Sequence, residues 1–349
     1  MIAANRPAQR PPGAKLLVVD ACRRINHASR SSFVEHLRAG DLVVANDAAT
    51  LPASLAGAHG ATGASVEVRL AGRPSLRPED VRRFSAVVFG AGDFRTRTED
   101  RPAPPALSAG DRLVLGPLRA TVERVLGHAR LVSLLFDGSP DEVWAGLARH
   151  GRPIQYAHVG APLALWDVWT RFAGPPVAFE PPSAGFALDW RALASMRGRG
   201  VEFETITHAA GISSTGDEGL DRLLPFDEPY SVPRATADAI VRAKARGGRV
   251  VAVGTTVVRA LEHAASEEGT VRACEGVATQ RIGPSSRLRV VDAILSGTHE
   301  AGTSHYELLR AFLDDATLTR ATLELDSRGY MTHEFGDSVL IERAAPGAC

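Results

Sequence analysis

Short apolar runs separated by glycine, proline and polar residues divide the chain. Where apolar residues occupy consecutive positions, the run is typical of a strand buried on both faces. The predicted strands span residues 16–20, 41–47, 201–207, 249–253 and 289–295, with a strand or turn pair at 330–335 and 338–341. Apolar residues at helical spacing predict helices at 32–37, 140–150, 189–199, 234–246, from Thr256 onward and 304–312. Strands that alternate with helices indicate an α/β domain.

The stretch from residue 54 to residue 136 has a different pattern. Short β-rich segments alternate there with Gly, Pro and Asp turns, and no long helical period intervenes. Such spacing is typical of a small antiparallel barrel or sandwich. We therefore predict a discontinuous α/β domain, residues 1–53 and 139–349, into which a small antiparallel β-barrel domain is inserted at residues 54–138.

The stretch from Gly247 to Glu262 predicts a strand, a glycine turn and a helix. The turn is Gly254-Thr255-Thr256, and Arg259 follows on about the same helix face as Thr256. Backbone N–H groups and the positive helix end would suit a carboxylate, a phosphate or a polar nucleoside edge. The alternative is a strand–turn–helix that binds nothing. Without G-x-G-x-x-G, and without a Lys after the glycine, the stretch supports neither a dinucleotide fold nor a P-loop.

Polar residues also follow other predicted strands. Asn46 and Asp47 end one strand, and His208 and His299 come just past two others. Ligands bind at the carboxyl ends of strands in open α/β sheets. An Asx turn is the alternative for Asn-Asp, and a structural role is the alternative for each histidine. Asp337, after Gly336, is either a turn residue or a carboxylate at the rim of the sheet.

Charge and composition narrow the class of protein. Forty Lys and Arg balance forty Asp and Glu, so no global basic charge indicates nucleic-acid binding, although a local patch stays open. Three scattered cysteines without C-x-x-C spacing argue against a disulfide framework and a structural zinc site. No secretory h-region and no apolar run of membrane-spanning length occurs. We expect a cytoplasmic protein that does not contact membranes.

Taken together, several segments resemble the S-adenosylmethionine:tRNA ribosyltransferase-isomerase family of queuosine biosynthesis. They follow the family order over nearly the whole chain, and the clearest is 243–262. The others are residues 41–47 with Pro52-Ala53, Pro182-Ser183-Ala184-Gly185, His208, Glu228 with Tyr230-Ser231-Val232-Pro233, His299, and Phe335-Gly336-Asp337.

The resemblance implies a fold, a reaction and roles for residues. It implies an α/β domain with an inserted β-barrel, and transfer of the rearranged ribosyl part of S-adenosylmethionine to 7-aminomethyl-7-deazaguanine in tRNA. Epoxyqueuosine forms, adenine and methionine leave, and no metal or other cofactor is needed. His208, His299 and Asp337 are then candidate acid/base groups. The candidate substrate-binding residues are Asn46, Asp47, Ser183, Gly185, Glu228, Gly254, Thr255, Thr256 and Arg259.

This chain also departs from the family pattern. Ala49 stands where the family has an Arg, and Gly302 where it has a Lys, so two plausible phosphate or base contacts are lost. Histidines are replaced at Ala187 and Phe226. Two alternatives therefore stay open: a paralogue that uses S-adenosylmethionine or a similar nucleoside with a small-molecule acceptor, and a nucleoside-binding protein without catalysis. We expect a monomer.

Overall fold

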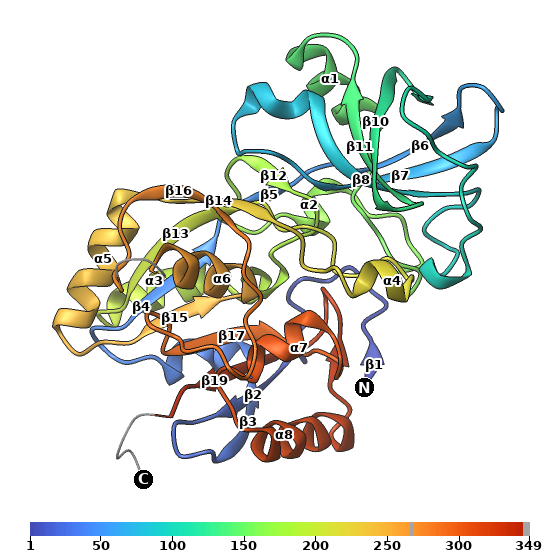
Figure 1. The fold of residues 1–349 in the computed structure, drawn as a ribbon. Helices are drawn as coiled ribbons and strands as arrows, with labels where there is room; N and C mark the ends of the chain where they lie inside the picture. The colour runs from blue at the N-terminus through green and yellow to red at the C-terminus, as the bar shows by residue number, and fades with distance from the viewer. Residues whose placement is uncertain (266–268, 345–349) are drawn as a thin grey trace.

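One sheet of nine strands forms the centre of the larger lobe in the computed structural model, which describes residues 1–265 and 269–344 (Figure 1). In spatial order the strands are β16 Cys274–Ala278, β14 Glu228–Val232, β13 Glu202–His208, β4 Leu42–Asn46, β15 Val250–Val253, β17 Ala293–Gly297, β19 Ser338–Glu342, β2 Lys15–Val19 and β3 Ile25–Ser29. Neighbours β13, β4, β15 and β17 run parallel. Their carboxyl ends meet at one side of the sheet, which we call the carboxyl edge.

The central strands are buried on both faces because almost every residue in them is apolar. In β15, Val250 and Ala252 join one hydrophobic core, whereas Val251 and Val253 join the other. Burial of each valine contributes about 1.5–3 kcal/mol. Helices cover both faces. On the first face they are α5 Arg234–Ala245, α6 Thr255–Ala264, α7 Ser304–Leu309 and α8 Asp315–Ser327; on the second they are α3 Trp190–Gly198 and a 3-10 helix, Arg30–His36.

The smaller lobe is a closed antiparallel barrel with the strand order β10-β11-β8-β7-β6-β9 (Figure 1). Its strands are β6 Ser54–His59, β7 Ser65–Gly72, β8 Arg83–Phe89, β9 Arg112–Leu115, β10 Leu118–His128 and β11 Leu131–Phe136. The predicted fold class, an α/β protein with a small antiparallel barrel, is confirmed. Helix α1, Pro140–His150, packs Val143 and Leu147 into the barrel core, although the sequence had assigned this helix to the α/β domain.

Short elements join the two lobes. Strand β5, Ala49–Thr50, follows β4 directly and pairs with β12, Pro176–Ala178, before the chain enters the barrel. Strand β1, Ile2–Ala3, pairs with β18, Met331–Thr332. The remaining helices are α2 Leu165–Val168 and α4 Glu218–Asp221. The carboxyl edge is therefore the side of the sheet from which the chain passes into the barrel.

The predicted strand at 289–295 is wrong in its first half. Strand β17 begins only at Ala293. The carboxylate of Glu262 accepts hydrogen bonds from the backbone N–H groups of Arg289, Val290 and Val291, at 2.7, 3.0 and 2.9 Å. Because these donors bond to a side chain, they cannot join a strand ladder.

Several elements were not predicted from the sequence. The longer ones are β3, β6, β14, β16 and α8. Cys274 is a free thiol, and Cys349 lies outside the described residues. Among the described residues, the helices are too short or too polar to span a bilayer.

Candidate active site at the carboxyl edge of the sheet

The turn between β15 and α6 requires glycine. Gly254 has φ 95° and ψ 155°, a backbone conformation that L side chains rarely adopt. No side chain caps the first turn of α6, so its N–H groups and the positive helix end are left for another partner. A Cβ built on Gly254 would lie 3.6 Å from the Cβ of Ala184. The structure thus brings the 3-10 helix Ser183–Ala187 beside this turn, as the candidates Ser183 and Gly185 require.

Asn46 connects the ends of two strands and the start of a helix at the carboxyl edge. Its side-chain amide donates to the carbonyl of His208 at 2.9 Å and lies 3.4 Å from the hydroxyl of Thr256. Its side-chain oxygen accepts from the N–H of His208 at 2.9 Å. The side chain is buried, and these bonds give it a structural role in holding β4, β13 and α6 together.

Asp47 is a carboxylate held by two hydroxyls. Thr205 and Thr207 donate to it at 2.9 and 2.7 Å. Partial burial raises the pKa of Asp47, and the two threonine hydrogen bonds offset only part of that effect. A carboxylate without a cationic partner at this edge is suited to accept a hydrogen bond from a ribose hydroxyl or an amine.

His208, Glu228 and Arg259 form a buried polar group beneath the edge. Glu228 accepts from His208 at 2.8 Å and from the Gly211 N–H, and it forms an ion pair with Arg259. Burial raises the pKa of Glu228, but Arg259 and His208 more than offset this and hold it below its ordinary value. The carbonyl of Ala278 accepts from the guanidinium at 2.9 Å. Because the guanidinium is paired inside the protein, its surroundings favour a structural role for Arg259 over the predicted substrate-binding role.

Asp337 lies in the scaffold. It accepts hydrogen bonds from the backbone N–H groups of Lys15 and Met331, at 2.7 and 2.9 Å, and is 2% exposed. It fixes the start of β2 against β18, so its surroundings favour a structural role over the predicted acid/base role.

His299 lies at the carboxyl edge, just past β17. Its Nε2 is 2.8 Å from the hydroxyl of Ser296, and its ring stacks on His305 with centroids 4.8 Å apart. Desolvation and the neighbouring His305 lower the pKa of His299 well below its ordinary value. The imidazole is therefore neutral at pH 7, which is the form that can accept a proton.

A second polar group, which the sequence did not single out, extends from this edge. It contains Tyr156, His158, Glu180, His333 and Glu334. The Tyr156 hydroxyl donates to the carboxylate of Glu180, and His158 pairs with Glu334 at 3.2 Å. Burial, with the nearby Glu334, raises the pKa of Glu180 to about 7. The adjacent His333-Glu334 pair was the only signal in the sequence, because its partners lie more than 150 positions away.

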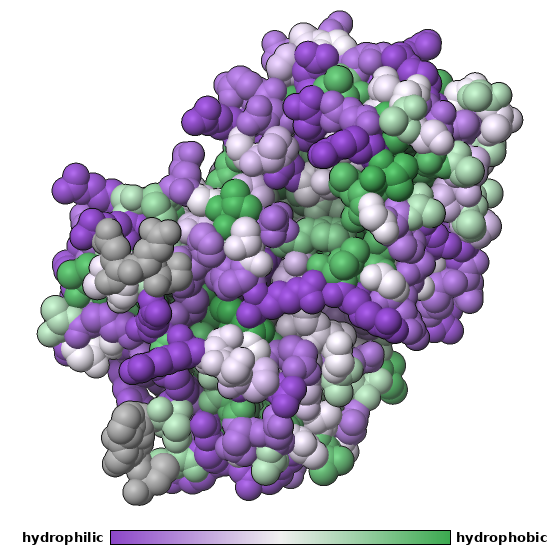
Figure 2. All heavy atoms as spheres, viewed as in Figure 1, coloured by the Kyte–Doolittle hydropathy of each residue, from purple (hydrophilic) through white to green (hydrophobic). Residues whose placement is uncertain are grey.

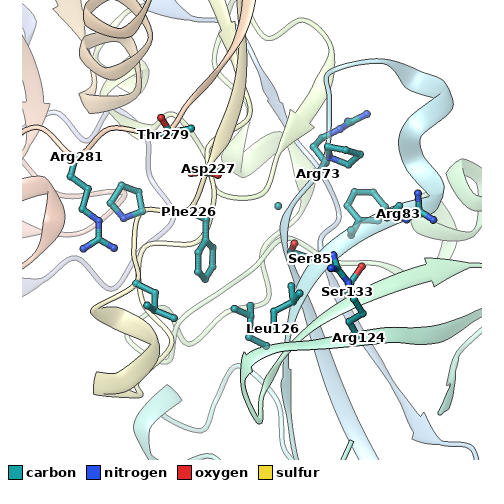
Figure 3. Close-up of a pocket in the computed structure, with 16 residues that line it drawn as sticks. Arg73, Arg83, Ser85, Arg124, Leu126, Ser133, Phe226, Asp227, Thr279 and Arg281 are labelled. Atoms are coloured by element: carbon teal, nitrogen blue, oxygen red, sulfur yellow. The ribbon is translucent and has the colours of Figure 1, made fainter. Parts of the chain in front are cut away.

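A cavity of about 590 Å³ lies where the two lobes meet. The barrel contributes Arg73, Arg83 and Arg124, and the α/β lobe contributes Phe226 and Arg281 (Figure 3). Figure 2 shows apolar residues exposed in the hollow between the lobes. Cationic and aromatic side chains around one cavity are a combination that suits single-stranded nucleic acid.

Arg73 is the notable residue of this cavity. It is 5% exposed, and Nη2 donates to the carbonyl of Arg77 at 2.7 Å. Its Nε and Nη1 have no hydrogen-bond partner within the described part of the chain. Burial lowers the pKa of Arg73 to about 10, so it remains charged at neutral pH. Arg73 therefore keeps two buried cationic donors beside the cavity without a partner, which is costly unless another group satisfies them.

The fold defines an α/β protein with an inserted barrel and a cavity between the two lobes. Residues 1–341 match the family model described as queuosine biosynthesis protein. The chain belongs to that family, as the sequence motifs had indicated.

Similar proteins carry a consistent name. Relatives from Sorangium cellulosum and Citrifermentans bemidjiense are 34% and 35% identical, over 97% of this chain and 94% and 95% of their own lengths. Both are named S-adenosylmethionine:tRNA ribosyltransferase-isomerase. The crystal structure of S-adenosylmethionine tRNA ribosyltransferase from Thermotoga maritima has a TM-score of 0.51 at 23% identity, covering 97% of this chain and 96% of that one. This likeness shows a shared fold.

The burial of the Glu228–Arg259 ion pair leads to a first prediction, about the stability of variants. Arg259→Met should destabilise the chain by roughly 3–5 kcal/mol, because it leaves the Glu228 carboxylate buried without its cation. Adding Glu228→Gln to that variant should restore part of the loss. Urea unfolding measures both. The exposed pair Arg222–Glu218 is the matched control, and Arg222→Met should cost less than about 1 kcal/mol. Equal losses in the two arginine variants would contradict the assignment.

The raised pKa of Asp47 leads to a second prediction, about how stability depends on pH. Its pKa is raised in the folded chain, so the folded state holds the proton more tightly than the unfolded state. Wild-type stability should therefore fall as the pH rises through that pKa, and Asp47→Asn should lack this loss. The stability of the variant relative to wild type, measured by urea unfolding, should grow as the pH rises above about 4, the ordinary pKa of Asp, and level off above the raised pKa of Asp47. Glu275→Gln, at an exposed position of β16, is the control. A difference that stays flat or shrinks would show the shift to be absent.

Proposed function

We propose that this chain is an S-adenosylmethionine:tRNA ribosyltransferase-isomerase. The reaction moves the ribosyl part of S-adenosylmethionine to the aminomethyl group of 7-aminomethyl-7-deazaguanine in tRNA, isomerises it to give epoxyqueuosine, and releases adenine and methionine. The observation that carries the proposal is the uncapped N-terminus of α6 at the carboxyl edge, within a chain that belongs to the family over residues 1–341.

The donor fits the groups gathered at this edge. The methionine carboxylate suits the free N–H groups of Thr255 and Thr256 at the positive end of α6. The carboxylate of Asp47 suits a ribose hydroxyl or the incoming amine. The 3-10 helix that carries Ser183 and Gly185 closes one side of the turn. No metal or further cofactor has a step in this proposal.

His299 is the proposed base. The sulfonium of S-adenosylmethionine acidifies the adjacent 5′ C–H, and a neutral imidazole is needed to remove that proton. His299 is partly exposed and neutral at pH 7, whereas His208 is fully buried and bonded to Glu228. Of the three predicted acid/base residues, His299 alone combines access to the edge with a free protonation site.

The cavity between the lobes supports an RNA acceptor over a small molecule. Ala49 and Gly302 lack the charged side chains of the family pattern, but four arginines from both lobes surround this cavity. Arginine binds phosphate groups bidentately, and Phe226 offers a face for an unstacked base. An acceptor of this kind places the reaction in the cytoplasm.

A third prediction tests this function. Adenine release from S-adenosylmethionine should require tRNA that carries the aminomethyl base, and His299→Gln should lower the rate roughly 10²–10⁴-fold, because the general base is lost. Chromatography of adenine measures the rate. Binding of S-adenosylmethionine should persist in the variant, and His36→Gln, on the 3-10 helix at Arg30–His36, serves as the control.

Three other outcomes of this experiment would each contradict one part of the proposal. Adenine release that needs a small amine instead of tRNA would contradict the proposed acceptor. Binding of S-adenosylmethionine without any release would contradict catalysis. Full activity in His299→Gln would leave the transferase assignment intact and remove His299 as the base.

A further inference from the structure

Three side chains from distant parts of the chain converge beside the carboxyl edge. His158 lies in the connector between α1 and α2, and His333 and Glu334 lie between β18 and β19. One potential ligand atom from each lies within 4.8 Å of the others. The Nε2 of His158 is 3.2 Å from a carboxylate oxygen of Glu334. The rings of His158 and His333 stack with centroids 4.3 Å apart. We call these three residues the His₂Glu cluster.

Packing alone does not explain the backbone conformation and the unbonded ring of His333. Its φ is +70°, in the left-handed region, where a residue other than glycine is uncommon. Its ring nitrogens have no hydrogen-bond partner among residues 1–265 and 269–344, and the residue is exposed. Unfavourable backbone conformations persist mainly at functional sites, where they hold a side chain in place. An exposed, unbonded imidazole stacked on a second histidine is positioned to take a ligand.

A small cavity adds an independent observation. It has a volume of about 10 Å³, and its wall includes His158, Glu334, Glu180 and Tyr156. The rest of its wall is largely apolar, and His333 lies outside it. A cavity of this size holds about one water-sized sphere. The space therefore suits a single ion or water and excludes an organic ligand.

We propose that the His₂Glu cluster binds one divalent transition-metal ion of the zinc class. Imidazole nitrogens select Zn²⁺ and related ions, whereas Mg²⁺ and Ca²⁺ prefer sites made of oxygen ligands. Zinc bonds of about 2.0–2.2 Å in a tetrahedral arrangement place neighbouring ligand atoms about 3.3 Å apart. The His158–Glu334 separation of 3.2 Å matches that spacing. A small shift of His333 toward the other two ligands completes the set, because its ligand atom lies within 4.8 Å of theirs.

The surrounding groups suit a bound ion. Glu180 and Tyr156, bonded to each other, line the same small cavity and can bind a water on the metal. The ion would join the α1–α2 connector to the turn after β18, two segments that meet at the edge of the candidate active site. It has no assigned step in ribosyl transfer, and the proposal stands whether or not the transferase activity is found.

Titration of the metal-free full chain with Zn²⁺ tests the site directly. Calorimetry should show one ion per chain. Each of His158→Ala, His333→Asn and Glu334→Gln should weaken binding at least about 100-fold, since outer partners of metal ligands alone account for roughly 10–100-fold. Asn tolerates a positive φ, so His333→Asn removes the ligand without adding backbone strain. His36→Ala is the matched control and should bind as wild type does.

Co²⁺ provides a spectroscopic readout that needs no variant. Wild-type chain with Co²⁺ should show the intense visible bands of low-symmetry, nitrogen-coordinated cobalt, and Zn²⁺ should also raise the Tm of the chain by binding the folded state. The weak spectrum of hydrated Co²⁺, zinc affinity unchanged in His333→Asn, or Mg²⁺ binding as tight as Zn²⁺ would each overturn the proposal.

Discussion

The burial of the parallel strands β4, β15 and β17 on both faces is the constraint on which the rest of the structure depends. Because β13, β4, β15 and β17 are parallel, every chain segment leaving them emerges at one edge. Their apolar residues fix the register, since a slip by one residue would exchange the two cores. In β4 and β17 the polar side chains stand near the strand ends, and Asn46, His208, Gly254 and His299 lie at or just past the ends of the four strands.

The polar groups at this edge divide into a scaffold and a reactive part. Asn46, Asp337 and the Glu228–Arg259 pair have their hydrogen bonds satisfied by the protein, so they hold strands and loops in position. The α6 N-terminus, Asp47 and His299 keep capacity for a partner. Desolvation favours the uncharged form of both Asp47 and His299, as expected where a site displaces water.

Consecutive apolar residues were enough to predict β4 and β15. The short β-rich segments between turn residues at 54–136 were enough to predict the barrel. Strand β14 escaped prediction because it begins with Glu228-Pro229 and is defined by pairing with β16 and β13, which are remote in sequence. The direction of Arg259 could not be predicted either. Helix α6 is buried almost throughout, so helical spacing did not reveal that the guanidinium turns toward Glu228.

Some residues of the candidate site could be predicted from the sequence, and others could not. Residues at strand ends were found because strand direction alone places them at the carboxyl edge. The His158, His333 and Glu334 cluster was missed because only the folded topology brings the α1–α2 connector to the turn after β18. Arg73 was missed because its unsatisfied donors depend on burial between two lobes, which no local pattern encodes.

We expect S-adenosylmethionine to bind at the carboxyl edge, where the ends of the parallel strands meet. A crystal structure of the chain with S-adenosylmethionine would show its position. The methionine carboxylate should accept hydrogen bonds from the backbone N–H groups of Thr255 and Thr256, and the ribose should lie between Asp47 and His299. Density for the ligand elsewhere, with the first turn of α6 left without a partner, would contradict it.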